Sequence, residues 1–328
     1  MARLVLAGDV GGTKTNLGLF EISDDGKLRL VRHERYVTLE FKTLEEVCLK
    51  FVAGARIEAA CLGVPGPIID GRATATNVHW QMSEQSLSLA LSDIKTRLIN
   101  DLGATAYGML YLAPDEVRVI NQAERTARGN IAVIAAGTGL GESALVYENG
   151  HYYAVASEGG HSDFAPVNDE QMELLRFLKA EFPDHVSYER VLSGPGITNL
   201  YRFQRKKSVV TEPEWLTKMI ASEDPAAAIS DAALEAKDEV CVATLTMFAE
   251  IYGAEAANLG LKVLALGGIY LGGGIAPKVL PFLTGDAFIR GYFSKGRMNA
   301  MLRQIPVRVS LNAGAALTGA AHSAAALL

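Results

Sequence analysis

Residues 3–22 read RLVLAGDVGGTKTNLGLFEI, and this stretch decides the fold. Its two ends, 3–8 and 15–22, are short apolar runs rich in Val and Leu, and glycines interrupt the sequence between them. Two strand-like segments that flank a glycine turn are typical of a β-hairpin. The sequence therefore predicts a hairpin at the start of the chain.

The same pattern returns at residues 130–147, NIAVIAAGTGLGESALVY, around a second glycine turn. When Gly11 is laid on Gly139, the aligned pairs are Val5 with Val133, Thr15 with Ser143 and Leu17 with Leu145. A repeat this far apart is too long for a solenoid period, so it predicts two related domains. We expect a first lobe from residues 1–112 plus about 312–328, and a second lobe from residues 113–311.

Composition indicates a packed globular protein. Of the 328 residues, 49% are hydrophobic and 21% are charged, which is enough apolar surface to offset the entropy lost on ordering the chain. The net charge is -6 and the pI is about 5.6, which argues against nucleic-acid binding because a phosphate backbone requires a clustered basic surface. The longest basic run, Arg205-Lys206-Lys207, is interpreted as a solvated loop.

Cysteine content and the apolar segments indicate a cytoplasmic protein with no membrane span. Cys48, Cys61 and Cys241 are odd in number and far apart, so they predict neither a disulfide framework nor a CxxC zinc site. The apolar start is too short for a signal peptide. Residues 309–328 carry no charge, but their Ala, Gly, Asn and His content favours a buried terminal helix over a membrane span.

Strands and helices are expected throughout the chain, as in an α/β protein. Residues 57–64 and 263–271 read as buried strands that end at turns rich in Gly or Pro. Asn168, followed by Gln171, is a helix-capping pattern, and Pro277 suits the first turn of another helix. The expected helices cover 43–51, 83–94, 104–112, 169–182, 197–204, 225–262 and the residues that follow 276.

Three glycine-rich turns follow predicted strands, at residues 8–15, 137–141 and 272–274. Because glycine has no Cβ, its backbone N–H groups can approach an anion closely, and phosphate is the natural guest. A P-loop is not indicated, because it requires Gly-Lys-Ser/Thr and the chain reads Gly12-Thr13-Lys14-Thr15. A Rossmann dinucleotide site is not indicated either, because Glu142 stands where its fingerprint requires the final glycine. One such turn alone would favour a plain hairpin, but three of them favour phosphate binding.

Polar side chains form a second group of candidates. Asn100-Asp101 follows a predicted strand, where an aspartate could take a proton from a substrate hydroxyl. Asn and Asp are also preferred helix N-caps, and the residues alone leave the two interpretations open. Glu158, His161 and Glu189 could hydrogen-bond the hydroxyls of a small polar ligand. A Glu/His pair could also bind a metal, but no third ligand at suitable spacing is visible.

Six stretches together resemble the bacterial ATP-dependent glucokinases, in order over nearly the whole chain. They are LAGDVGGTKTNLGL at 6–19, INDLGATAYG at 99–108, AAGTGLGESAL at 135–145, EGGHSDFAP at 158–166, YERVLSGPGITNLY at 188–201 and LGGGIAPKVL at 271–280. The resemblance implies the actin-like ATPase (ribonuclease H-like) fold, an α/β fold of two lobes with a duplicated β-hairpin core and a cleft between the lobes. It also implies ATP-dependent phosphorylation of D-glucose at the 6-hydroxyl, feeding glycolysis.

The resemblance further implies residue roles. Asp101 would be the catalytic base, and Asp9 would hold Mg²⁺ through water. Glucose would be bound by Asn77, Asn100, Asp101, Glu158, His161 and Glu189. ATP would be bound by Gly8, Asp9, Gly11, Gly12, Thr13, Lys14, Thr138, Gly139, Gly272, Gly273 and Gly274. Lys14 could contact the terminal phosphate or face solvent, and the residues do not decide between the two.

Alternative functions, structural zinc and the oligomeric state are also addressed by the sequence. A kinase for mannose or an amino sugar is the main alternative, and a non-catalytic sugar sensor is a weaker one. The cysteine-rich zinc motif of the related repressor/open-reading-frame/kinase group is absent, which implies no structural zinc. The family commonly dimerises, and apolar helices within 230–262 could form the face of a homodimer.

Overall fold

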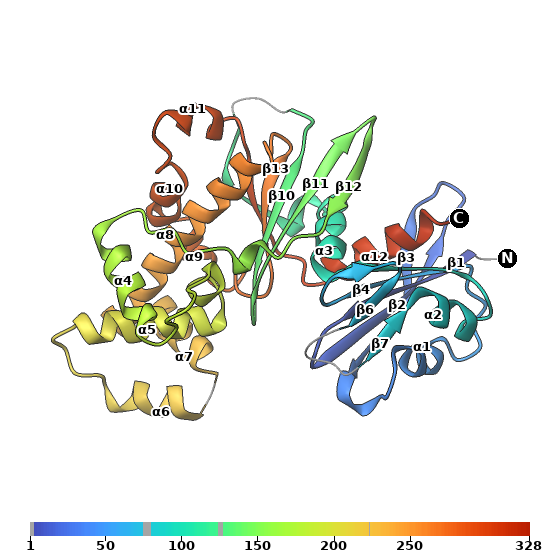
Figure 1. Ribbon diagram of the computed structural model, residues 1–328, viewed down its shortest axis with the longest axis horizontal. Coiled ribbons are helices and arrows are strands. Elements are labelled where there is room, and N and C mark those ends of the chain that lie inside the picture. The colour runs from blue at the N-terminus through green and yellow to red at the C-terminus, as the bar shows by residue number, and fades with distance from the viewer. Residues whose placement is uncertain (1–2, 75–79, 124–126, 223) are drawn as a thin grey trace. The chain divides into compact units, whose positions relative to one another are not determined.

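The structure is a computed structural model that describes residues 3–74, 80–123, 127–222 and 224–328. Its contacts divide the chain into two compact units (Figure 1). The first unit comprises Met1–Glu116, Gly150–Ala156 and Asn312–Leu328, and the second comprises Val117–Asn149 and Ser157–Leu311. The short segment 150–156, which the sequence places in the second lobe, groups with the first unit.

A five-stranded sheet forms the centre of the first unit, in the order β3-β2-β1-β4-β8. Its strands are β1 (Arg3–Val10), β2 (Lys14–Ile22), β3 (Leu28–Val37), β4 (Ala59–Val64) and β8 (Lys95–Asn100). Neighbours among β1, β2 and β3 are antiparallel, whereas β4 runs parallel to β1 and β8 runs parallel to β4. The carboxyl ends of β1, β4 and β8 therefore lie at one edge of the sheet.

Helices cover both faces of this sheet (Figure 1). Leu6 and Leu62 pack on the face covered by α1 and α2, whereas Val5 and Cys61 pack on the face covered by α12. This alternation is the period of two expected for strands that are buried on both sides. The other elements of the unit are α1 (Leu44–Val52), α2 (Glu84–Ala90), α3 (Asp101–Met109), α12 (Ala315–Ala325), β5 (Ile68–Ile69), β6 (Arg72–Thr74), β7 (Gln81–Ser83), β12 (His151–Val155), η1 (Thr38–Glu40) and η2 (Pro114–Glu116).

The second unit is also built on a central sheet, in which its five strands follow the order β11-β10-β13-β14-β9. They are β9 (Val117–Asn121), β10 (Ile131–Ala136), β11 (Leu140–Glu148), β13 (Gly268–Gly272) and β14 (Val307–Ser310). β10 and β11 form an antiparallel hairpin, β13 runs parallel to β10, and β14 runs parallel to β13. The ends of β10 and β13 thus lie at one edge, as the strand ends do in the first unit.

The long helix α8 (Glu239–Lys262) forms the core of the second unit, where Phe248 and Tyr252 are fully buried. In the described part of the chain it is the one helix long and apolar enough to cross a membrane, but 78% of its apolar window is buried. Its apolar side chains therefore serve the core of their own unit. The remaining elements are α4 (Asp169–Lys179), α5 (Gly194–Lys207), α6 (Glu214–Ser222), α7 (Pro225–Leu234), α9 (Leu280–Leu283), α10 (Asp286–Tyr292), α11 (Asn299–Leu302), η3 (Gly159–His161), η4 (Tyr188–Arg190) and η5 (Gly296–Met298).

Both predicted hairpins are present, but their residue-by-residue match is different from the sequence-based one. The last paired residues before each turn are Val10 with Thr15 in the first hairpin and Ala136 with Leu140 in the second. Gly11 therefore corresponds to Gly137, and the match with Gly139 is wrong. The parallel strands support this new match. Asp9, one residue before the end of the first ladder, pairs with Gly63 of β4, and Ala135, at the same position in the second ladder, pairs with Gly272 of β13. The second turn is one residue shorter, which an alignment without gaps conceals.

Several segment boundaries also differ from the expectation, and the helix expected over 225–262 is divided between Leu234 and Glu239. β13 begins at Gly268 rather than at residue 263, because α8 ends in a turn in which Leu264 adopts a left-handed φ of 49°. The helix expected after 276 begins only at Leu280, and Pro277 lies in the preceding turn. Arg205–Lys207 is the last turn of α5 instead of a loop, where cations complement the helix dipole. An apolar or charged run alone does not mark where a helix ends.

The helices α3 and α12 cross at two glycines. A Cβ on Gly108 would lie 1.9 Å from the carbonyl oxygen of Ala315, and a Cβ on Gly319 would lie 1.9 Å from that of Ala104. The two backbones therefore touch at positions that only glycine fits. Gly103, in the same α3, is different, because its Cβ would lie an ordinary 3.7 Å from the nearest side chain.

Substitution of the two α3 glycines should have opposite effects on stability. Gly108→Ala should destabilise the protein by about 3 kcal/mol, because the new methyl group forces the helices apart. Gly103→Ala should stabilise it by about 0.5–1 kcal/mol, because alanine restricts the unfolded chain and suits a helix. Chemical denaturation of both variants checks the pair, and equal stabilities would contradict the close crossing.

Candidate functional site

Three parallel strand ends form the candidate site of the first unit. Asp9, near the end of β1, pairs with Gly63 of β4, and Asn100 ends the next strand, β8. Neighbouring strands are about 5 Å apart, so Asp9 and Asn100 lie roughly 10 Å apart at the same edge. A Cβ on Gly63 would lie 2.9 Å from the Cβ of Ala104, so this glycine lets the first turn of α3 pack close to the sheet. Ligands of open α/β sheets bind at such edges.

Asn100 is the N-cap of α3. Its Oδ1 accepts hydrogen bonds from the backbone N–H groups of Leu102 and Gly103, at 2.9 and 3.3 Å. Its Nδ2 donates to the carbonyl oxygen of Gly66 at 3.2 Å. Both lone pairs of Oδ1 therefore serve the helix, and one amide hydrogen is left for a ligand. Asn100, rather than Asp101, is the cap that the sequence left open.

Asp101 is the half-buried first residue of α3. Its Oδ1 accepts the backbone N–H of Leu102 at 2.8 Å, and the hydroxyl of Thr105 donates to its carbonyl oxygen at 3.0 Å. The N-terminus of a helix carries partial positive charge, which favours an ionised carboxylate. An ionised aspartate fixed at a strand end can accept a proton from a hydroxyl group.

The turn between β1 and β2 has its carbonyl groups tied to the protein. Thr38 donates its hydroxyl to the carbonyl oxygen of Gly11 at 2.8 Å and its N–H to that of Thr13 at 3.0 Å. Among the described residues, the N–H groups of Gly12 and Thr13 have no acceptor. Such a turn offers its donors to an anion. The side chain of Lys14 is exposed, so both of its predicted roles stay open.

Asp9 belongs to a polar chain that crosses the sheet. Asn16 Nδ2 donates to Asp9 Oδ2 at 3.2 Å, and Arg35 Nε donates to Asn16 Oδ1 at 2.9 Å. Burial raises the pKa of Asp9 above its usual value, although the Asn16 hydrogen bond and the Arg35 charge oppose the shift. In the described ranges no three His, Cys, Asp or Glu side chains gather as metal ligands. A single desolvated carboxylate fits a hydrated Mg²⁺, which keeps most of its water ligands.

Two glycine turns of the second unit lie side by side at the ends of β10 and β13. The carbonyl oxygen of Gly137 accepts the N–H of Gly194, the first residue of α5, at 2.9 Å. The preceding Ala136 accepts the N–H of Ile275 at 3.2 Å. Thr138 is exposed at this edge. The hydrogen bonds thus bring both turns and the N-terminus of α5 together.

The predicted nucleotide glycines differ in the space around them. A Cβ on Gly8 would lie 2.8 Å from the side chain of Leu62, and one on Gly273, where φ is 78°, would lie 2.2 Å from the carbonyl oxygen of Ala136. Core packing explains both glycines. A Cβ on Gly274 would meet nothing within 4 Å in the described structure, so this glycine leaves room for a ligand.

A short antiparallel pairing brings the predicted sugar-binding segments together. The N–H of Phe164 donates to the carbonyl oxygen of Val186 at 2.9 Å, and the N–H of Tyr188 donates to that of Ser162 at 3.0 Å. These bonds join the segment after η3 to the segment that leads into η4. Glu158 lies at the start of η3, with an exposed side chain.

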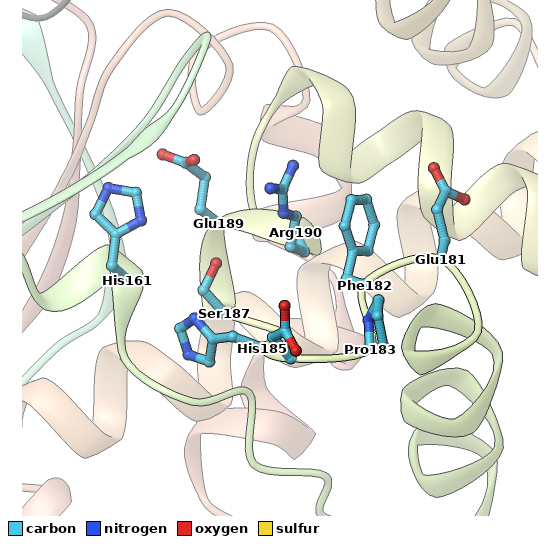
Figure 2. A pocket seen from close by; sticks show the side chains of 9 residues that line it. His161, Glu181, Phe182, Pro183, His185, Ser187, Glu189 and Arg190 are labelled. Atoms are coloured by element: carbon cyan, nitrogen blue, oxygen red, sulfur yellow. The ribbon is translucent and has the colours of Figure 1, made fainter.

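His161 and Glu189 line the same pocket of about 380 Å³, as Figure 2 shows. Glu189 Oε2 also accepts the backbone N–H of Leu140 at 3.0 Å, next to the second glycine turn. One predicted sugar-binding carboxylate therefore touches a predicted phosphate-binding turn. The same pocket wall carries His185, whose Nε2 lies 3.0 Å from Asp163 Oδ1.

The sequence interpretation missed the residues that hold these segments in place. A Cβ on Gly160 would lie 2.0 Å from the carbonyl oxygen of Leu140, so η3 rests directly on β11. A Cβ on Gly159 would lie 2.3 Å from Oε2 of Glu142, which is 1% exposed. The signal available in the sequence was a glutamate inside the apolar strand segment ESALVY.

The described units each carry part of the predicted site. Asn77 lies outside the described residues. The first unit holds Gly8, Asp9, Gly11, Gly12, Thr13, Lys14, Asn100 and Asp101. The second unit holds Thr138, Gly139, Glu158, His161, Glu189, Gly272, Gly273 and Gly274.

Known proteins resemble the chain over its full length. A family model described as Glucokinase matches residues 6–327. Glucokinase from Trichormus variabilis is 38% identical, over 99% of each chain. The crystal structure of glucokinase from an Antarctic psychrotroph is 34% identical, with a TM-score of 0.83 over 98% of this chain and 99% of the other.

A more distant structure confirms the predicted α/β, actin-like fold. The ROK family glucokinase from Streptomyces griseus, solved in complex with glucose and AMPPNP, is 22% identical, with a TM-score of 0.66 over 98% of this chain and 99% of the other. This likeness extends to the fold alone, whereas the family model and the closer relatives cover the sequence itself. The chain belongs to the glucokinase family.

Proposed function

We propose that this glucokinase transfers the γ-phosphoryl group of ATP to the 6-hydroxyl of D-glucose, giving glucose 6-phosphate for glycolysis. Family membership supports ATP-dependent glucose phosphorylation. The bound glucose and AMPPNP of the Streptomyces griseus protein support the same ligands. The observation that carries the residue assignment is Asp101 at the first position of α3, where Asn100 already supplies the cap.

Asp101 is the proposed base. Phosphoryl transfer passes through a loose transition state, so catalysis requires alignment and charge stabilisation more than covalent chemistry. Asp101 accepts the proton of the 6-hydroxyl as the new O–P bond forms, while the bond between the γ-phosphorus and the β,γ-bridging oxygen breaks and ADP leaves. The N–H groups of Gly12 and Thr13 stabilise charge on the phosphoryl oxygens. The other predicted phosphate contacts are Gly11, Lys14, Thr138 and Gly139.

Asp9 holds the magnesium ion through water in this proposal. Mg²⁺, when bound, neutralises charge on the β- and γ-phosphates of ATP. The desolvated carboxylate of Asp9 supports this role, because a nearby cation offsets its burial. Gly274 is the glycine with room beside the adenosine, Gly273 shapes the turn, and Gly272 ends the strand that leads into it.

Glucose recognition is assigned to polar side chains that can hydrogen-bond sugar hydroxyls. Asn100 donates its remaining amide hydrogen to a sugar oxygen, since its Oδ1 is committed to the helix. Glu158 and Glu189 accept hydrogen bonds from sugar hydroxyls, and His161 completes the set. Asn77 is retained on the family resemblance alone.

The cellular setting rests on the same resemblance. We expect a cytoplasmic homodimer with no structural zinc. The three cysteines are buried at separate positions in the two units, and burial raises the pKa of each thiol, which disfavours the thiolate that zinc requires. A kinase for mannose or an amino sugar is the alternative, because the same carboxylates could accept related hydroxyl patterns.

Asp101→Asn should lower kcat by about 10²–10⁴-fold, because the amide cannot take the proton. ATP binding should be unchanged, since Asp101 is assigned to the sugar hydroxyl. A coupled kinase assay and nucleotide titration check this, with the exposed Asp93→Asn as the control from the same unit. Turnover of Asp101→Asn close to that of the control would remove Asp101 from the reaction.

The sugar preference is tested by comparing kcat/KM for glucose, mannose, fructose and N-acetylglucosamine in one coupled assay. Glucose should exceed each other sugar by about tenfold or more, because buried polar groups left unpaired by a wrong sugar cost transition-state binding. A higher value for mannose or N-acetylglucosamine would favour the alternative kinase. Absence of any sugar-stimulated ATP turnover would favour the non-catalytic sugar sensor.

A further inference from the structure

Glu142 is a buried acid directly beneath the predicted sugar-binding turn. It belongs to β11 and is 1% exposed. Its Oε2 occupies the space that a Cβ on Gly159 would need, so the carboxyl group packs against the backbone next to Glu158. Within the described part of the chain its other oxygen, Oε1, is buried without a hydrogen-bond partner. The mechanism above makes no use of this side chain.

Glu255 is a second buried acid, and it connects to the other sugar-binding segment. It lies on α8 with 0% exposure. Asn258 Nδ2 donates to Glu255 Oε2 at 2.8 Å and also to the hydroxyl oxygen of Tyr188 at 3.1 Å. Tyr188 immediately precedes Glu189. The ammonium group of Lys262 lies 3.4 Å from Glu255 Oε1.

The two acids are hydrogen-bonded to each other, and burial followed by the charge of Glu255 raises the pKa of Glu142 to about 8. At neutral pH Glu142 therefore keeps its proton and can donate it to Glu255, whose Oε1 faces the ammonium group of Lys262. The titratable groups around the pair come from several elements. They are Tyr188 of η4, Tyr252 and Lys262 of α8, and Lys295 before η5.

One continuous network thus underlies both predicted sugar-binding carboxylates. It runs from the backbone of Gly159 through Glu142 and Glu255 to Asn258 and Tyr188. We propose that the Glu142–Glu255 pair is a positioning device that fixes the geometry of Glu158 and Glu189 for glucose. This inference rests on the sugar-binding roles proposed for those two residues.

A pair that served only packing would behave differently. Buried ion and acid pairs seldom add stability over apolar residues, and removal of one partner destabilises the fold wherever the pair lies. A packing role therefore predicts a loss of stability with an unchanged KM for glucose. A positioning role predicts a specific change in that KM, because small displacements of ligand-binding groups are costly.

The first test separates these two roles through Glu142→Ala and Glu142→Gln. Glu142→Ala should raise KM for glucose about tenfold and leave KM for ATP unchanged, because Glu255 loses its donor and the Gly159 backbone loses its support. Glu142→Gln should keep KM for glucose near the wild-type value, since its amide still donates to Glu255. Asp238→Asn is the matched control, because Asp238 is a buried acid of the same unit and lies 3.0 Å from Arg205. This variant should be less stable than the wild type, with an unchanged KM for glucose.

The second test uses pH. Below about 8 the neutral form of Glu142 prevails, and as pH rises through that value ionisation places two like charges side by side in the core. The KM for glucose of the wild type should therefore rise between pH 8 and 9, whereas Glu142→Gln should show no such rise. A rise of equal size in both proteins would overturn the assignment to Glu142.

Amide hydrogen exchange of the full chain provides a readout that does not depend on sugar binding. Exchange in residues 157–161 and 186–190 should be faster in Glu142→Ala and unchanged in Glu142→Gln and Asp238→Asn. Unchanged exchange in Glu142→Ala would overturn the inference. Gly160→Ala, which forces a methyl group against the Leu140 carbonyl, is the positive control for loosening of η3.

Glu158→Gln and Glu189→Gln, measured alongside, distinguish failure of this inference from failure of the proposed sugar roles. If both raise KM for glucose and Glu142→Ala does not, the sugar roles stand and the positioning role is wrong. If neither changes KM for glucose, the sugar roles fail, and the positioning role that rests on them fails with them.

Discussion

The backbone contact between α3 and α12 is the constraint on which the first unit depends. α12 comes from the last residues of the chain, and it packs both on α3 and on β1. α3 begins with Asp101, and β1 leads into the glycine turn. Because Gly108 and Gly319 allow the two helices to touch, the position of the proposed base depends on glycines that take no part in the chemistry. The C-terminal helix therefore supports the elements that carry the proposed base and the first glycine turn.

In the second unit, buried polar side chains support the segments that carry the predicted sugar-binding residues. η3 rests on β11 through the close approach of Gly160, and the Glu142–Glu255 pair fills the space beneath it. Apolar side chains could fill that space at lower cost, because two buried carboxyl groups must be desolvated and share one proton. Hydrogen bonds are directional, however, and apolar contacts are not. The pair packs against Gly159 through Glu142 and is hydrogen-bonded through Asn258 to Tyr188, so it can define two loop positions at once.

The residues predicted both hairpins, because glycine turns after apolar strands are local features. The resemblance to the bacterial glucokinases implied the fold, and the site residues stay a prediction. The sequence did not predict the correct hairpin match, because Gly11 and Gly139 align only if the unequal turn lengths are ignored. The role of Asp101 came from the family resemblance, since the residues alone left base and cap equally open. Glu142 and Glu255 could not be paired from the sequence, because only the packing of β11 on α8 brings them together.

The glycines predicted to bind ATP show that a sequence motif does not distinguish glycines required by packing from glycines that contact a ligand. They lie in turns after strands or at the ends of those strands, yet they differ in what a side chain would meet. Gly8 and Gly273 are fixed by core atoms within 3 Å, so their presence follows from packing whether or not a ligand binds. A Cβ on Gly274 would meet nothing among the described residues, so packing does not explain it. A glycine that the fold does not require is the stronger indicator of a ligand, and by that criterion Gly274 supports nucleotide binding more than Gly8 does.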